Sequence, residues 1–187
     1  MANNKSIFNN FVWRFLERIG AQGVAFIISI VLARLLDPSA YGTIALISVI
    51  TSILQVFIDS GLGTALIQKK DADDVDFSSV FYFNLIFSVL IYALVFVFSP
   101  FIAAFYEDPS LTPMIRALGL TLIVSGVKNV QQAYVSKTMQ FKKFFFSTIG
   151  GTIGSAVVGI WMAYEGYGVW ALIFQNLINV AVGTLIL

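Results

Sequence analysis

The sequence contains neither cysteine nor histidine among its 187 residues. The first absence excludes disulfide bonds and thiolate chemistry, and the second removes the commonest general base and metal ligand. Charged residues make up only 11%, where an ordinary soluble domain has about 25%. The sequence also has no glycine-rich phosphate loop, no nucleophile motif and no cluster of metal-ligand residues. We therefore predict that the chain is not an enzyme and that it has no catalytic residue, metal site or cofactor.

Apolar sequence takes the place of these features, since 58% of the residues are hydrophobic and 18 are phenylalanine. A bilayer core of about 30 Å is crossed by about 20 helical residues. Long uncharged runs alternate with short polar segments, which predicts an all-α integral membrane protein with one bundle of six transmembrane helices. No small-residue cleavage site follows the first apolar run, so we expect it to be a retained span. The predicted spans are residues 13–36, 40–60, 78–103, 113–135, 143–164 and 167–187.

The segment from Ala33 to Gly42 joins the first two spans. Asp37 is suited to cap a new helix, and Pro38 suits the first turn of that helix. Proline also discourages the preceding helix from continuing. We therefore predict a tight reversal between two antiparallel helices at this point.

The distribution of Lys and Arg predicts the orientation of the bundle, because these residues gather on the cytoplasmic side of membrane proteins. With the N-terminus in the cytoplasm, only Arg34 and Arg116 fall on the outer side. The inner side then receives Lys5, Arg14, Arg18, Lys69, Lys70, Lys128, Lys137, Lys142 and Lys143.

Polar residues recur inside the spans at spacings of three and four, which places them on one face of each helix. In the fifth span, the spacings of Gly150 with Gly154 and of Ser155 with Gly159 favour close helix packing. The glutamine and asparagine side chains, which include Gln22 and Gln55, are compatible with two environments. Because an amide is costly in lipid, they face either neighbouring helices or a wet cavity.

Four of the charged residues in or near the spans are candidates for a site, because an ionisable group there normally faces an interior or a cavity. Arg18 either reaches the head groups or faces a cavity. Arg116 and Lys128 are twelve residues apart in the fourth span, about 18 Å along a helix, so we expect at least one of them in a cavity. Asp59 is either a helix-end residue or a partner of Arg18. Cationic groups of this kind suit an anionic ligand such as a pyrophosphate.

Three segments resemble the bacterial polysaccharide and O-antigen flippases of the multidrug/oligosaccharidyl-lipid/polysaccharide superfamily, in particular the branch of colanic-acid exporters. They are Leu32–Gly42, Asp59–Gln68 and Tyr167–Leu172. The resemblance implies an inner-membrane protein with two six-helix bundles around a central cavity, which moves undecaprenyl-pyrophosphate-linked oligosaccharide by alternating access. This chain resembles the first bundle, so we expect it to be the first half of a longer, MATE-like transporter.

The resemblance also implies partners and a site. The partners are the lipid-linked oligosaccharide, membrane lipid, the C-terminal half of the transporter, and the polysaccharide polymerase and glycosyltransferases; nucleic acid is not among them. The family's cationic cavity suggests Arg18, Arg116 and Lys128 as substrate-binding residues. Polar neighbours on the stripes add Gln22, Gln55 and Asp59 as candidates.

Two other functions stay open from the sequence. A multidrug or cation antiporter of the same superfamily needs an essential carboxylate, for which Asp59 is the candidate. A membrane scaffold for polysaccharide assembly would instead tolerate changes in the cavity and respond to changes on the surface.

A reporter fused after Lys70 tests the predicted orientation. We expect a signal typical of the cytoplasm, because Lys69 and Lys70 end the second predicted span on the basic side. A fusion after Glu107 is the matched control and should report the opposite side. A periplasmic signal after Lys70 would contradict the orientation.

Overall fold

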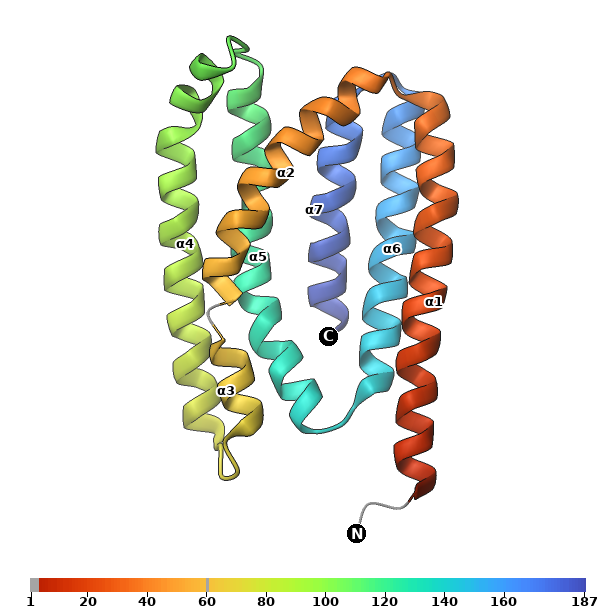
Figure 1. Ribbon diagram of the computed structural model, residues 1–187, viewed down its shortest axis with the longest axis vertical. Helices are drawn as coiled ribbons and strands as arrows, with labels where there is room; N and C mark the ends of the chain where they lie inside the picture. The colour runs from red at the N-terminus through yellow and green to blue at the C-terminus, as the bar shows by residue number, and fades with distance from the viewer. Residues whose placement is uncertain (1–3, 60) are drawn as a thin grey trace.

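A computed structural model describes the backbone of residues 4–59 and 61–187, and the side chains of residues 15, 19–59 and 61–187. The long helices stand side by side, and one of them slants across the others (Figure 1). With its length and apolar composition, this arrangement confirms the predicted all-α membrane bundle. The helices are α1 (Asn4–Leu35), α2 (Pro38–Asp59), α3 (Leu62–Gln68), α4 (Asp74–Phe105), α5 (Leu111–Lys137), α6 (Phe141–Tyr164) and α7 (Val169–Ile186).

The helix bounds follow the predicted spans, with two differences. Helix α1 begins at Asn4 rather than at residue 13, and its apolar part is the shorter stretch Ile19–Leu35. Helix α3 was not predicted. It follows Gly61, whose φ of 75° is accessible to glycine at little cost, so the chain turns there and starts a new helix.

The turn between α1 and α2 has the predicted form. Helix α2 starts at Pro38, and the backbone N–H of Ala40 donates to the carbonyl of Asp37 over 3.0 Å. At the other end of the bundle, a capping box starts α4: the N–H of Asp76 donates to Asp73 Oδ1 over 2.9 Å, and the N–H of Asp73 donates to Asp76 Oδ2 over 3.2 Å.

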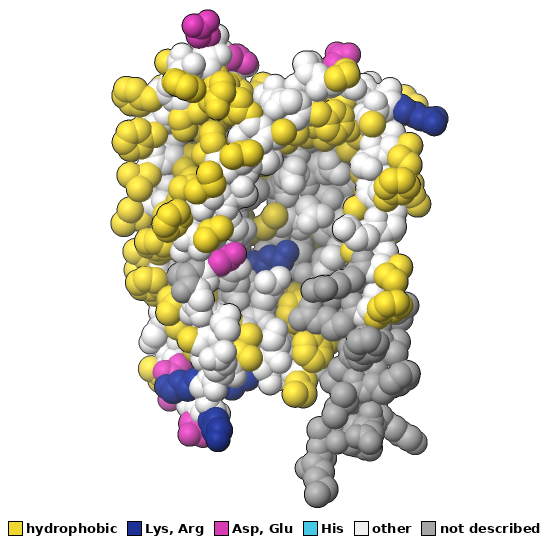
Figure 2. All heavy atoms as spheres, in the orientation of Figure 1, with side chains coloured by type: hydrophobic (Ala, Val, Ile, Leu, Met, Phe, Trp, Pro, Cys, Tyr) yellow, Lys and Arg dark blue, Asp and Glu magenta, His cyan; other side chains and the backbone are white. Residues whose placement is uncertain are grey.

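Helix α4 shows the reversed polarity of a protein in lipid. Its packed face buries Asn84, Ser88 and Ser99, whereas the large side chains of Phe83, Leu94 and other residues are exposed. Hydrophobic side chains accordingly cover its outer surface (Figure 2). Small and weakly polar residues let membrane helices approach one another, and apolar residues face the lipid.

Glycines set the closest helix contacts. A Cβ at Gly126 of α5 would lie 2.9 Å from Ser88 Cβ on α4. A Cβ at Gly151 of α6 would lie 2.8 Å from the backbone oxygen of Asn179 on α7. The tight backbone contact of α6 is therefore at Gly151, one residue away from the predicted Gly150–Gly154 pair, while Gly159 is tight against Gln175 as its predicted spacing suggests.

Three apolar clusters form the core of the described residues, and α2 belongs to the two larger ones. Its first turns, with Ala40 and Ile44, pack with residues of α1, α6 and α7. Further along, Ile47 and Ile58 pack with α4, α5 and Ile173 of α7. This change of neighbours along one helix explains the slant of α2 in Figure 1.

Arg116 of α5 binds the backbone of α4 beside a proline. Pro100 lies inside α4 and has no N–H, so the carbonyl of Phe96 loses its usual partner four residues on. Arg116 Nε donates to this carbonyl over 3.3 Å and to Ser99 Oγ over 2.9 Å, while Ser99 Oγ itself donates to the same carbonyl over 2.9 Å. The guanidinium carbon also lies 3.9 Å from the centre of the Phe96 ring.

Gly151→Ala should destabilise the bundle by about 1–3 kcal/mol, because its methyl group would press on the backbone of α7. Gly154→Ala is the matched control on the same helix, since its Cβ would meet only ordinary contacts at 3.7 Å and beyond. Thermal denaturation in detergent measures the difference. Equal melting temperatures for the two variants would contradict the tight contact.

Arg116→Ala should destabilise the protein by about 1–3 kcal/mol, since it removes a charged donor from the Phe96 carbonyl and from Ser99 Oγ and leaves Ser99 as the only side-chain donor to that carbonyl among the described residues. The loss should be smaller when Pro100→Ala is also present, because residue 100 then supplies the missing N–H. A double-mutant cycle by thermal denaturation measures this coupling. Arg34→Ala, an exposed arginine at the same end of the bundle, is the control. Additive effects would refute the explanation.

Candidate functional site

The polar stripes of α2 and α5 meet Asn176 of α7 around one cavity of about 350 Å³. Each stripe lies on a single helix face because its members are three or four residues apart. The face of the molecule between α2 and α1 is hollowed, and charged side chains are visible there (Figure 2). The polar lining of the cavity consists of Ser48, Thr51, Ser52 and Gln55 of α2, Thr121 and Ser125 of α5, and Asn176 of α7.

Asp59 ends α2 next to this cavity and accepts two amide hydrogen bonds. Asn129 Nδ2 donates to Asp59 Oδ1 over 2.6 Å, and Gln55 Nε2 donates to the same oxygen over 3.1 Å. A second pocket of about 360 Å³ continues from Asp59 along α3 and α5, with Thr64 and Gln132 among its lining residues. The two amides hold the exposed carboxylate at the rim of the hollow.

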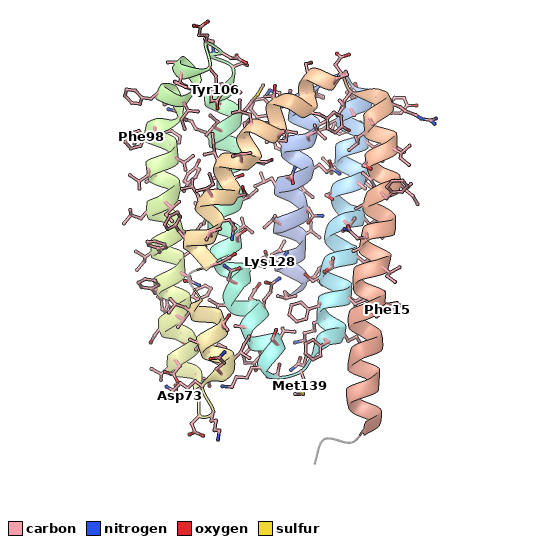
Figure 3. The ribbon with its side chains drawn as sticks, in the orientation of Figure 1. Phe15, Asp73, Phe98, Tyr106, Lys128 and Met139 are labelled. Atoms are coloured by element: carbon pink, nitrogen blue, oxygen red, sulfur yellow. The ribbon has the colours of Figure 1, made fainter. Side chains whose placement is uncertain are left out.

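Lys128 lies deep in the bundle, half-buried on α5. It stands nine residues before the end of the helix, about 13 Å along its axis. Figure 3 places it beside the lower part of α7. There its Nζ lies 3.1 Å from the Cβ position of Gly183, whose carbonyl accepts a hydrogen bond from Ser147 Oγ over 2.5 Å. The absent side chain of Gly183 makes room for the ammonium group.

Helices α1, α6 and α7 form the other wall. A pocket of about 180 Å³ lies between them, lined by Ser29, Thr152 and Gln175 among others. In this pocket Asn179 Nδ2 donates to Ser155 Oγ over 3.3 Å. Tyr41 also lines it, and its buried hydroxyl has no hydrogen-bond partner within the described part of the chain. Polar groups are therefore available on both walls of the hollow.

The structure brings some of the predicted site residues together and separates others. Gln55 and Asp59 are in direct contact, and Gln22 lines a shallow pocket on α1 with Ser29. Arg116 is bound to α4 through its Nε, away from the pocket around Asp59. The side chain of Arg18 lies outside the described residues, so its pairing with Asp59 stays a prediction.

Sequence reasoning missed Asn129 as the strongest partner of Asp59. A signal was present, since Asn129 lies four residues after Ser125 on the polar face of the same helix. What periodicity could not supply was the pairing of two residues that are 70 positions apart.

Comparison with known proteins supports one family. The family model described as "Polysaccharide biosynthesis protein" matches residues 31–187. The succinoglycan biosynthesis transport protein ExoT of Rhizobium meliloti is 26% identical over 96% of this chain and 36% of its own length. The lipopolysaccharide biosynthesis protein WzxC of Escherichia coli is 22% identical over 93% of this chain and 35% of its own length.

A third relative, the teichuronic acid biosynthesis protein TuaB of Bacillus subtilis, is 32% identical over 49% of this chain and 19% of its own length. The chain spans about a third of the length of the first two relatives. No solved structure matches it. Since the family model covers most of the helices described above, the chain belongs to the polysaccharide biosynthesis protein family.

Proposed function

We propose that this chain is the N-terminal six-helix bundle of a flippase that moves lipid-linked oligosaccharide across the bacterial inner membrane for surface polysaccharide synthesis. The observation that carries the proposal is the polar hollow between membrane-spanning helices, with the half-buried Lys128 on the same helix, α5, as Thr121 and Ser125 of its lining. The names of the relatives, which include a transport protein for succinoglycan, support the same substrate class.

The lining of the hollow suits a sugar chain. Serine, threonine, asparagine and glutamine offer both hydrogen-bond donors and acceptors, which is what sugar hydroxyls require. Polar groups on membrane-spanning helices cost free energy unless they contact protein or water. Because the hollow leaves such groups uncovered by protein, it would hold water within the hydrocarbon layer of the membrane. Such a wet hollow lowers the cost of moving a hydrophilic head group past hydrocarbon.

Lys128 suits the charged part of the substrate. An ammonium group at this depth attracts the pyrophosphate that joins the sugar to its polyprenyl carrier. Asp59, at the rim, repels the same group. The electrostatic potential would therefore draw the pyrophosphate away from Asp59 and toward Lys128. The carrier's hydrocarbon tail would stay in the surrounding lipid.

The remaining parts of the proposal concern the whole transporter. The second half of the full-length protein would close the hollow, and the two halves would expose it alternately to each side of the membrane. The basic residues around Lys69 and Lys143 favour an orientation with the N-terminus in the cytoplasm. The polymerase and the glycosyltransferases of the pathway would be its functional partners.

Lys128→Met in the full-length protein should lower surface polysaccharide about tenfold or more at an equal amount of protein, since a charge-assisted contact contributes about 1.5–3 kcal/mol. Lys128→Arg should retain more export than Lys128→Met, because it keeps the charge. Polysaccharide on intact cells is the measurement. Lys70→Met, an exposed loop lysine, is the matched control.

Export at the wild-type level by Lys128→Met would overturn the charged-cavity model and favour the scaffold. The antiporter makes a different prediction, because it requires Asp59. Loss of drug resistance in Asp59→Asn, with polysaccharide export intact, would replace the flippase by the antiporter.

A further inference from the structure

A second kind of cavity opens on the outer surface of the bundle. It lies between the first turns of α4, the last turns of α5 and the start of α6, at the lower end of the bundle in Figure 1. It has a volume of about 350 Å³. We call it the aromatic pocket after the residues that line it. The lining residues used below are Phe77, Phe81, Tyr82, Gln131, Tyr134 and Lys143.

The aromatic pocket is separate from the polar hollow. On α5, Ser125 and Asn129 face the hollow, whereas Gln131 and Tyr134 line the aromatic pocket. At about 100° per residue, these two pairs point to opposite sides of the helix. A ligand in the aromatic pocket therefore lies outside the transport path, next to the surrounding bilayer.

The walls of the pocket suit a hydrocarbon chain. The rings of Phe77 and Tyr134 meet edge to face with their centres 5.4 Å apart, and those of Phe81 and Tyr82 are 5.7 Å apart. The side chain of Tyr82 is 63% exposed. These rings form an open apolar slot near the end of the membrane-spanning helices, where aromatic residues typically meet the head-group region.

Two polar groups in this pocket have no side-chain partner among the residues that the structure describes. Among the side chains that the structure describes, exposed Lys143 at the start of α6 forms no ion pair. Lys137, a lysine on α5, is bound within the protein, because its Nζ donates hydrogen bonds to the backbone carbonyls of Leu66 and Lys69. The Gln131 side-chain oxygen is buried without a hydrogen-bond partner. The pocket thus offers a cation and an acceptor that needs a donor.

We propose that the aromatic pocket binds an anionic glycerophospholipid whose head group carries hydroxyls, such as phosphatidylglycerol. Lys143 pairs with its phosphate, a head-group hydroxyl donates to Gln131, and one acyl chain lies along the aromatic wall. A choline head group fits less well, since its own ammonium balances the phosphate and it has no N–H or O–H to donate. This proposal does not depend on the transport function.

Fluorescence quenching by brominated lipid tests the proposal in the full-length protein. All native tryptophans are replaced by phenylalanine, and Tyr82→Trp is the probe; Phe81→Trp is the second probe if the first does not fold. Vesicles of phosphatidylcholine contain a small fraction of brominated phosphatidylglycerol or of brominated phosphatidylcholine. We expect about a fivefold preference for phosphatidylglycerol, which corresponds to ~1 kcal/mol for one lysine near anionic lipid.

Two variants separate a built site from general surface charge. Lys143→Gln should abolish the preference, and Lys142→Gln, the same change one residue earlier outside the pocket lining, should leave it. Equal loss in both variants, or equal quenching by both lipids in the unaltered probe protein, would overturn the site. Absence of quenching by either lipid would also overturn it and would indicate that protein, from another part of the chain or a second copy, covers the pocket.

Discussion

Inside a bilayer, every polar group of the chain must find its partner within the protein or in an enclosed wet space. That requirement explains where the helices of this bundle touch. Ser88 and Ser99 are turned inward and large apolar side chains outward on α4. Even the carbonyl freed by Pro100 is satisfied, because Ser99 of the same helix and an arginine from the next helix both donate to it. Such polar contacts add to the glycine contacts and apolar clusters that hold neighbouring helices together.

The same requirement explains why the polar groups that are not buried between helices line the hollow. Because α2 slants from one apolar cluster to the other, the faces of α5 and α7 beneath it stay partly uncovered. Gln55, Asn129 and Asp59 satisfy one another at the edge of this opening. The hollow is therefore a consequence of helix geometry, and its lining is a consequence of the cost of leaving amides in lipid.

Local sequence patterns were sufficient for part of this structure. Uncharged runs predict the long helices, and Asp37 with Pro38 predicts the first turn, because both depend on the cost of local conformations and of burial in lipid. Arg116 shows where such reasoning stops. Its contact depends on a proline in a neighbouring helix, and no periodicity in α5 reveals that contact.

The contact at Gly151 gives a second example of this limit. A stripe of small residues predicts close packing on α6, but the rotation of the helix decides which glycine meets the backbone of α7. That rotation is set by the whole interface. For the site, spacing identified Gln55 and Asp59 as neighbours on α2, whereas Asn129 is brought to them by the tertiary fold.

The packing of α2 in two apolar clusters has a mechanical consequence. Its first turns are packed with α1, α6 and α7, and its later turns with α4 and α5. The helix therefore connects the half of the bundle that contains α1 and α6 to the half that contains α4 and α5. Spreading those halves apart near Ala40 would unpack one cluster or the other. A displacement of the other end, at Asp59, would likewise unpack the fully buried Ile58 from its cluster with α4 and α5.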